Sequence, residues 1–271
     1  MRTEEIGHVV LRYGHCLSMI KEISKTQIDR LGDRLRKDDI SDDDLRLLDL
    51  YRRDFFEAYE IVIGNIREKL SLEPTGRPAK STTSISDKLL RESIRLSQIQ
   101  DIAGCRLIVE DVAVQDTTVE LLKILFENVT VVDRREHPSH GYRAVHVIVN
   151  CLGKTIEIQI RTQLQQLWAE LSEKFSDVID PAIKYGGGDK KIQGLLINAS
   201  ELVNKQEFLE DSFTNMKLLS SNASLPEERK QAIAKMQEKV DKIRDEVYTK
   251  LRHLTDDVVP KFKELIDDIS D

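Results

Sequence analysis

The sequence has 271 residues, and its composition excludes several classes of protein. Hydrophobic residues make up 40% and charged residues 33%, which is typical of a soluble globular chain with one large core or two modest ones. The chain has no apolar run near the roughly 18 residues that cross a membrane, and its start, MRTEEIGHVV, lacks the order of a signal peptide. We therefore expect a cytoplasmic protein that does not enter a membrane.

The net charge and the cysteines argue against three further classes: nucleic-acid-binding, zinc-binding and disulfide-rich proteins. The net charge of -7 argues against broad nucleic-acid binding, although a local basic patch is compatible with it. The three cysteines, Cys16, Cys105 and Cys151, are far apart and form no CxxC pair. This spacing argues against a zinc site and against a disulfide framework.

Residues 1–70 have the pattern of helices. Ser41 followed by Asp44 is typical of a helix start, because the serine caps the first turn and the acid completes it. After it, apolar residues recur at spacings of three and four from Leu48 to Leu70. This pattern predicts one long helix with a single apolar stripe.

Residues 76–188 alternate between strand and helix patterns, after Pro74, Gly76 and Pro78 interrupt the helical period. The clearest strand is 155–161, in which every second residue is isoleucine, and Gly153 before it marks a hairpin turn. The predicted fold is α+β, a mixed β-sheet of about five strands flanked by helices. The other predicted strands are 105–109, 129–133 and 144–151, and the predicted helices are 112–126 and 164–175.

From about residue 189 the chain is again helical. Ser224-Leu-Pro226 is expected to start a helix, and apolar residues of 233–254 then follow a near-heptad spacing. This seam packs either on the 190–219 helix or on another copy of the chain. The predicted domains are a helical N-terminal extension (1–70), a central domain (71–188) and a helical C-terminal extension (189–271).

The polar face of the 155–161 strand presents candidates for chemistry. It carries Glu157, Gln159 and Arg161, a row that a solvated sheet face alone would also explain. Asp101 stands at the entry to the 105–109 strand. If the two strands are neighbours, Asp101 and Glu157 converge on one Mg²⁺ ion, which prefers one or two carboxylates plus phosphate oxygens and water.

Two further segments suggest a nucleotide ligand. The stretch 76–84 combines a glycine, two cations and several hydroxyls just before a helix, a composition that suits phosphate groups but also suits ordinary helix capping. Tyr142, flanked by cations in GYRAVH, is placed to stack on a nucleobase, or else to serve the strand that follows it.

Taken together, five segments resemble the RelA/SpoT synthetase domain, a nucleotidyltransferase-like fold. They are GRPAKSTTSISDKL, DIAGCRLIV, GYRAVHV, EIQIRT and QLWAE, in the family's order over residues 76–188. The resemblance implies a GTP diphosphokinase, an enzyme that transfers the β,γ-pyrophosphate of ATP to the ribose 3′-hydroxyl of GTP or GDP and so makes (p)ppGpp. Such transfer depends on positioning and charge neutralisation more than on covalent catalysis.

The resemblance also implies roles for individual residues. Asp101 and Glu157 would be the catalytic pair and would hold Mg²⁺, with Glu157 also a candidate acceptor of the hydroxyl proton. The residues implied for ATP are Arg77, Lys80, Ser84, Lys88 and Arg106. The residues implied for the acceptor nucleotide are Tyr142, stacked on guanine, with Arg143, His146, Gln159 and Arg161.

Departures from the family pattern leave the acceptor open. Two residues separate Arg77 from Lys80 where the family has one, His140 replaces a common asparagine, and Ser172-Glu173 replaces a common Glu-His pair. The chain has no HDxxED hydrolase signature, so it resembles a small stand-alone synthetase of the stringent response. In several such enzymes C-terminal helices mediate oligomerisation, and the 233–254 seam would permit a homo-oligomer.

Two alternatives remain at this point. One is a toxin-type relative that pyrophosphorylates the 3′ end of tRNA or makes another alarmone, with an antitoxin as a partner. It would need a basic surface, for which the candidates are Arg134, Arg135, Lys184, Lys190 and Lys191. The other is a catalytically silent nucleotide-binding scaffold, against which the presence of both Asp101 and Glu157 argues.

Overall fold

The structure, a computed structural model, describes residues 23–221, 226–262 and 264. Cys16 and the predicted helix start at Ser224 lie outside these residues. The contacts divide the chain into two compact units. A helical unit comprises the described part of Met1–Phe55 with Lys80–Ile99, and a sheet unit comprises Phe56–Ala79 with the described part of Gln100–Asp271. The three-part domain division expected from the sequence stays a prediction.

The helical unit is built from α2 (Lys25–Lys37), α3 (Asp42–Arg53), α5 (Thr82–Arg91) and a short 3₁₀ turn, η1 (Leu96–Gln98). The predicted helix start is confirmed: the Ser41 side chain accepts from the Asp44 N–H and the Asp44 side chain accepts from the Ser41 N–H. The largest fully buried side chains in the described part of this unit are Leu31, Leu48, Ile85, Leu89 and Leu96.

The single long helix predicted from Leu48 to Leu70 is wrong. The chain forms α3 and then a separate helix, α4 (Phe56–Leu70), with a break at Asp54 and Phe55. Neither glycine nor proline marks the break, and the apolar spacing continues across it. The break falls where the chain passes from the helical unit to the sheet unit, so the two halves of the stripe belong to different units.

The sheet unit contains a five-stranded sheet in the order β1-β2-β5-β4-β3. Only β2 and β5 are parallel, so the predicted mixed α+β sheet is confirmed. The sequence did not predict β1, which pairs with β2 at the sheet edge. The strands are β1 (Thr75–Arg77), β2 (Ala103–Val109), β3 (Thr130–Asp133), β4 (Val145–Cys151) and β5 (Lys154–Thr162).

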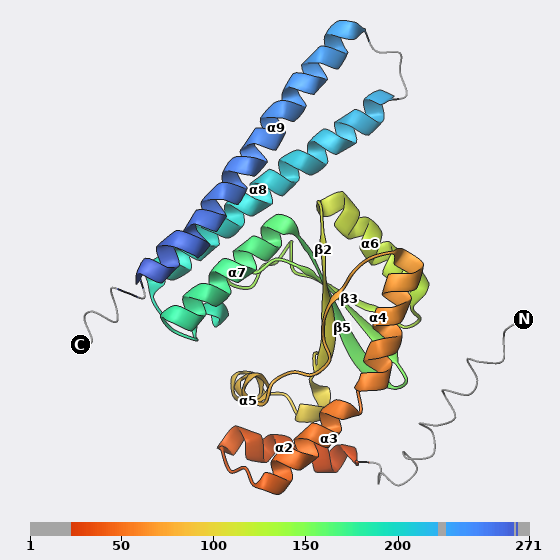
Figure 1. The fold of residues 1–271 in the computed structure, drawn as a ribbon, viewed down its shortest axis with the longest axis vertical. Helices are drawn as coiled ribbons and strands as arrows, with labels where there is room; N and C mark the ends of the chain where they lie inside the picture. The colour runs from red at the N-terminus through yellow and green to blue at the C-terminus, as the bar shows by residue number, and fades with distance from the viewer. Residues whose placement is uncertain (1–22, 222–225, 263, 265–271) are drawn as a thin grey trace, which may run out of the picture. The chain divides into compact units, whose positions relative to one another are not determined.

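The two faces of this sheet differ in chemistry. On one face lie buried apolar side chains from β2, β4 and β5, among them Cys105, Val147 and Ile158. The helices α4 and α6 (Val112–Leu125) lie on one side of the sheet, and α7 (Gln163–Val178) lies on the other (Figure 1). Tyr59 of α4 approaches Gly76 on the apolar side, so α4 and α6 cover the apolar face, while α7 borders the polar face.

The hairpin between β4 and β5 turns where the sequence predicted it. Leu152 and Gly153 both have positive φ, 51° and 71°, as a tight two-residue hairpin turn requires. The turn sets the register in which Ile148 lies opposite Glu157 and His146 lies opposite Gln159. It therefore determines which side chains of β4 share a face with the polar row of β5.

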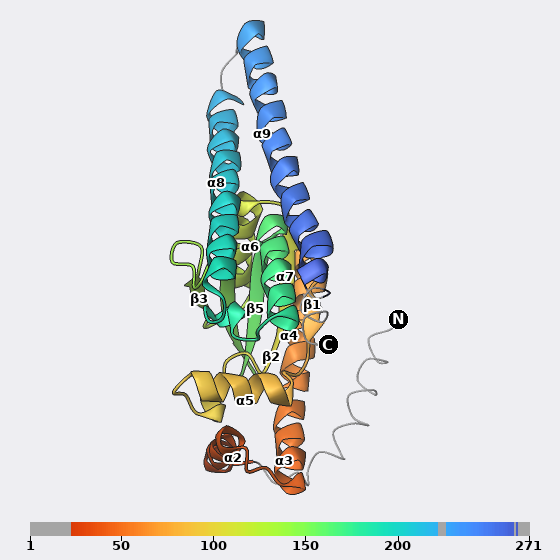
Figure 2. The same cartoon turned by 90° about the vertical axis from the view of Figure 1, so that its left-hand side faces the viewer.

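The C-terminal part of the sheet unit is helical. After α7 and η2 (Ile183–Tyr185), α8 (Lys190–Ser221) and α9 (Glu227–His253) run antiparallel, and a π-helical turn, η3 (Leu254–Val258), follows α9 (Figure 2). Val240, Val247 and Leu251 of α9 are buried, so this part of the predicted seam packs within the chain, whereas Met236 and Ile243 of the same seam are exposed. Among the helices of the described ranges, none combines the length and apolarity needed to cross a membrane.

Candidate active site

The polar row of β5 lies on a face that its two neighbouring strands complete. The pairing puts Gly104 and Arg106 of β2 beside Glu157 and Gln159. On the other side, His146 of β4 lies opposite Gln159. Since cross-strand partners share a face, one surface collects a carboxylate, an imidazole, an amide and guanidinium groups. The segment predicted as a possible solvated face is instead largely covered.

Four of these side chains and that of Tyr142, which precedes β4, form a closed circuit that we call the hydrogen-bonded ring. Glu157 Oε1 contacts His146 Nδ1 at 2.8 Å, and His146 Nε2 contacts the Tyr142 hydroxyl at 2.9 Å. Arg161 Nη2 donates to the Tyr142 hydroxyl and to Gln159 Oε1, both at 3.0 Å. Gln159 Nε2 donates to Glu157 Oε2 at 2.7 Å, which closes the circuit.

The ring keeps the Glu157 carboxylate ionised. Burial by itself disfavours the charge, but the hydrogen bonds from His146 and Gln159 outweigh it, so the pKa of Glu157 is below its ordinary value. The nearby charge of Asp101 acts in the opposite direction and raises this pKa. Asp101 and Glu157 are thus close enough to repel each other, as the sequence analysis expected if their strands were neighbours.

Asp101 reaches this position because β2 runs directly beside β5. A Cβ on Gly104 would lie 2.5 Å from the carbonyl oxygen of Glu157, so the close approach of the strands requires glycine there. Asp101 precedes β2 and is buried. Arg77 of β1 approaches it, with Nη2 at 3.3 Å from the Asp101 carbonyl oxygen and 3.8 Å from its carboxylate.

The pair of carboxylates fits a magnesium ion. Both acids are largely buried and repel each other, a cost that a cation would remove. In the ranges that the structure describes, no group of three or more His, Cys, Asp or Glu side chains is placed to hold a metal. Two protein carboxylates are sufficient for Mg²⁺, which usually keeps water and phosphate oxygens as its other ligands.

Positive charge gathers on the same face. The Nε atoms of Arg106 and Arg161 are buried, and neither has a hydrogen-bond partner among the described residues. Burial, and then the charge of Arg161, lower the pKa of Arg106. Two buried Nε donors without a partner among the described residues favour an anionic ligand over a neutral one.

Arg143 is predicted to line the same pocket as Tyr142, yet the structure places it elsewhere. Its Nε donates to Ser200 Oγ of α8 at 3.0 Å, and its Nη1 donates to the carbonyl oxygen of Arg135. Tyr142 and His146 are four residues apart and share a face, whereas Arg143 is an odd number of residues from both. The two-residue period of an extended chain therefore directs it to the opposite side.

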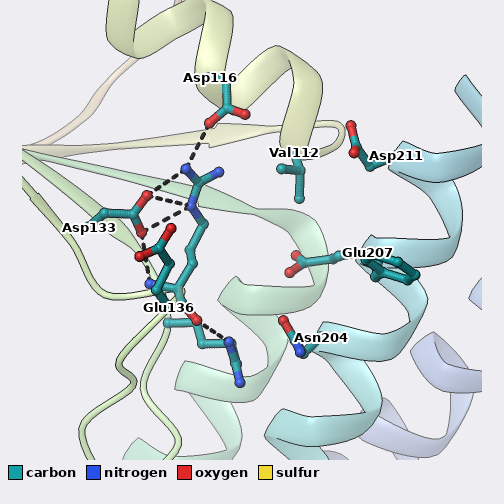
Figure 3. Close-up of a pocket in the computed structure, with 10 residues that line it drawn as sticks. Val112, Asp116, Asp133, Glu136, Asn204, Glu207 and Asp211 are labelled. Carbon is teal, nitrogen blue, oxygen red and sulfur yellow. Dashed lines mark hydrogen bonds and ion pairs between the residues drawn. The ribbon is translucent and has the colours of Figure 1, made fainter. Parts of the chain in front are cut away.

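Arg143 lines a separate, largely acidic pocket of about 370 Å³ between α6, the end of β3 and α8 (Figure 3). Arg135 crosses it and pairs with Asp116 at 2.7 Å and with Asp133 at 2.6 Å. Glu207 is buried in its wall and accepts hydrogen bonds from Thr162 and Gln165. Burial raises the pKa of Glu207. Because Arg135 pairs with both Asp116 and Asp133, most of its charge is neutralised within the protein.

The remaining residues implied for ATP lie in the helical unit. Lys80 precedes α5, and Ser84 and Lys88 lie on it. The Ser81 side chain caps α5 by accepting from the Ser84 N–H, and its hydroxyl also donates to Ser84 Oγ at 2.8 Å. Ser81 is therefore a capping residue, and the nucleotide-binding role of Lys80, Ser84 and Lys88 stays a prediction.

Sequence reasoning missed the helix α7 as a wall of the site. Gln166 accepts from Arg161 Nη1 at 3.0 Å, and the ring of Trp168 lies 6.5 Å from that of Tyr142. A signal was present, because three glutamines follow β5 directly in QLQQLW and two of them, Gln165 and Gln166, are buried. Buried amides usually have specific partners.

A protein-family profile matches residues 76–176, and the family is described as "Region found in RelA / SpoT proteins". The matched residues run from β1 through most of α7. They contain Asp101 and the whole hydrogen-bonded ring.

Two curated relatives match parts of the chain. A protein of Mycobacterium tuberculosis, named only as uncharacterized, is 39% identical over 113 residues, 40% of this chain and 41% of that protein. A probable chloroplastic GTP diphosphokinase of Arabidopsis thaliana is 35% identical over 95 residues, 34% of this chain and 13% of that protein. The matches therefore span less than half the length of these relatives.

Among solved structures, the small alarmone synthetase 1 of Bacillus subtilis bound to its product pppGpp is similar to this chain. The two are 26% identical, and the alignment covers 63% of this chain and 98% of that chain with a TM-score of 0.49.

Proposed function

Because the chain carries a RelA/SpoT domain over residues 76–176, we propose that it is an ATP-dependent pyrophosphokinase acting on GTP or GDP. In the proposed reaction the bond between the α-phosphate of ATP and its β,γ-diphosphate breaks. A bond forms between the β-phosphorus and the acceptor's 3′ oxygen, AMP leaves and the hydroxyl proton is released. The observation that carries the proposal is that two carboxylates lie near each other: Glu157 is held in the hydrogen-bonded ring, and the charge of Asp101 acts on it.

The chain's own residues have distinct parts in this proposal. The aromatic side chain of Tyr142 supplies a stacking face for the guanine, and Glu157 is the candidate acceptor for the hydroxyl proton. The residues proposed to bind ATP are Arg77, Lys80, Ser84, Lys88 and Arg106. Asp101 and Glu157 would hold Mg²⁺, which when bound neutralises charge on the diphosphate oxygens.

The acceptor set is revised in one respect. Arg143 is left out, because its guanidinium contacts Ser200 and the Arg135 carbonyl rather than any member of the ring. Tyr142, His146, Gln159 and Arg161 remain. The unused, buried Nε donors of Arg106 and Arg161 support a polyanionic ligand at this face.

Transfer to the 3′ end of tRNA is the alternative, and one observation weakens it. Arg135, one of the cations that a tRNA surface would need, is paired with Asp116 and Asp133. An acidic pocket next to these residues would repel a phosphate backbone.

The decisive experiment follows the fate of the ATP label. Purified protein is incubated with Mg²⁺, ATP labelled in its terminal phosphates, and GTP, GDP or deacylated tRNA in separate reactions. We expect label on the guanine nucleotide and release of AMP. Label only on tRNA would favour the toxin-type activity, and no transfer to any acceptor would leave the scaffold function.

A further inference from the structure

We propose that Arg161 is the positioning residue that holds the acceptor-stacking tyrosine and the catalytic carboxylate in one arrangement. This inference rests on the proposed function, since it assigns a task to Arg161 in the same site. The resemblance implies that Arg161 lines the acceptor pocket, yet Arg161 is only 4% exposed. A side chain buried to this extent contacts other side chains more than it contacts a ligand.

The chemistry of the guanidinium gives the ring a direction. Arginine only donates hydrogen bonds, so the Tyr142 hydroxyl and Gln159 Oε1 must both accept from Nη2. Since the amide oxygen of Gln159 faces Arg161, its Nε2 faces Glu157 Oε2 and donates to it. In this arm of the ring, Arg161 donates to Gln159, and Gln159 in turn donates to the Glu157 carboxylate.

The other arm has the same direction. His146 Nδ1 lies 2.8 Å from a carboxylate oxygen, and two acceptors would not approach so closely, so Nδ1 carries a proton. In the neutral imidazole Nε2 then accepts, and its donor is the Tyr142 hydroxyl at 2.9 Å. Both arms therefore start at a permanent donor, Arg161, and end on the two oxygens of Glu157.

Arg161 also fixes the orientation of the aromatic ring. Its guanidinium carbon lies 5.1 Å from the centroid of the Tyr142 ring, and Tyr142 contacts His146 edge-on on another side. A third contact, from Nη1 to Gln166 of α7, anchors the guanidinium itself. A single side chain thus orients the proposed stacking surface and both oxygens of the proposed metal ligand.

The test combines Arg161→Met, Tyr142→Phe and the double variant, with Arg244→Met as the matched control. Arg244 is a partly buried arginine of α9 in the same unit, and it contacts Glu210 and the Glu110 carbonyl rather than the ring. With wild type we expect transfer to guanine nucleotide. Arg161→Met should raise the acceptor KM and lower kcat, each about tenfold, because a charged hydrogen bond is lost on each arm. The KM for ATP should change less than twofold, roughly the scatter expected when no contact is lost.

The double variant distinguishes positioning from a general structural role. If Arg161 acts partly through the Tyr142 hydroxyl, its removal should raise the acceptor KM much less in the Tyr142→Phe background. Additive effects, equal increases in both KM values, or an Arg161→Met variant that behaves like Arg244→Met would each overturn the inference. A lower melting temperature alone would not support it.

A measurement without substrates keeps the inference testable if the proposed function fails. Nitrogen NMR of the free protein should show a proton of His146 on Nδ1, with slow exchange. Arg161→Met should speed that exchange, and Arg244→Met should not. No transfer by wild type would refute the proposed function, whereas unchanged exchange in Arg161→Met would refute the positioning role.

Discussion

The residues proposed for the acceptor and those proposed for ATP are held in different ways. Four acceptor residues, Tyr142, His146, Gln159 and Arg161, form one hydrogen-bonded circuit with Glu157, all within the sheet unit. The ATP residues are divided: Arg77 and Arg106 belong to the sheet unit, and Lys80, Ser84 and Lys88 belong to the helical unit.

From agreement with the family pattern alone, one would expect the ATP residues to be the better ordered set, but the acceptor residues are. The acceptor segments depart more from the family pattern, yet their side chains hold one another in place before any ligand binds. Preorganisation of this kind lowers the entropy that binding must overcome. The donor segment is closer to the pattern, but its residues are divided between the two units. Agreement with a motif and mutual ordering of side chains are separate properties.

The largest expected effect comes from the two acids that serve both sides. Asp101→Asn or Glu157→Gln should lower transfer about a thousandfold or more, because charge neutralisation during diphosphate transfer is lost. Transfer rates with saturating ATP and GTP measure this. Thermal unfolding checks that the variants remain folded, and near-wild-type transfer by either one would refute the catalytic pair.

Substitutions of the ATP residues should change the KM for ATP and not the KM for GTP. Arg77→Ala or Lys88→Ala should raise the KM for ATP about 10- to 100-fold, the loss expected for one charge-assisted phosphate contact. The KM for GTP should stay unchanged. Initial rates measured over a range of both substrate concentrations give the two KM values. An equal rise in both would refute the assignment of these residues to ATP alone.

Tyr142→Phe should show a smaller effect, confined to the acceptor. It keeps the aromatic ring and removes only the hydroxyl that links Arg161 to His146. We expect a two- to tenfold rise in the acceptor KM, about the contribution of one neutral hydrogen bond. Tyr142→Ala is the comparison variant, since it also removes the stacking face and should cost more. Equal effects of the two substitutions would contradict stacking.

The smallest effect concerns the stability of the helical unit in acid. The hydrogen bond from Arg34 lowers the pKa of Asp44 to about 2, although burial opposes it. An unfolded Asp has a pKa of about 3.9, so this stabilisation is complete above that pH and is lost as the pH falls towards 2. Asp44→Asn should remove this part of the acid dependence. It should also lower the melting temperature by a few degrees at neutral pH, because it removes the carboxylate charge that pairs with Arg34.

Unfolding curves of wild type and Asp44→Asn between pH 2 and 7 test this. The acceptor KM at neutral pH serves as the control and should not change, because the ring lies in the other unit. Identical pH dependence in the two proteins would show that the Arg34–Asp44 pair is not stabilising.

The elements that sequence reasoning found are those whose signal is local. The alternation of isoleucines identified β5, Gly153 identified its hairpin, and Ser41 identified the start of α3. The adjacency of Asp101 and Glu157 was foreseen only on the condition that their strands were neighbours, and β2 and β5 are. The break between α3 and α4 and the edge strand β1 were missed, because no Gly or Pro marks the first and the second is only three residues long.

What the sequence determined by itself was therefore the position of four of the five strands, the polar and apolar faces of β5, and the list of side chains able to do chemistry. Periods of two and of three to four residues encode these within a few residues of chain. Only the tertiary structure decided that Arg161 is a buried member of the hydrogen-bonded ring and that Arg143 lies in a separate pocket. The reason is physical: the ring depends on the register of strands distant in sequence, and no local period records which side chains that register brings together.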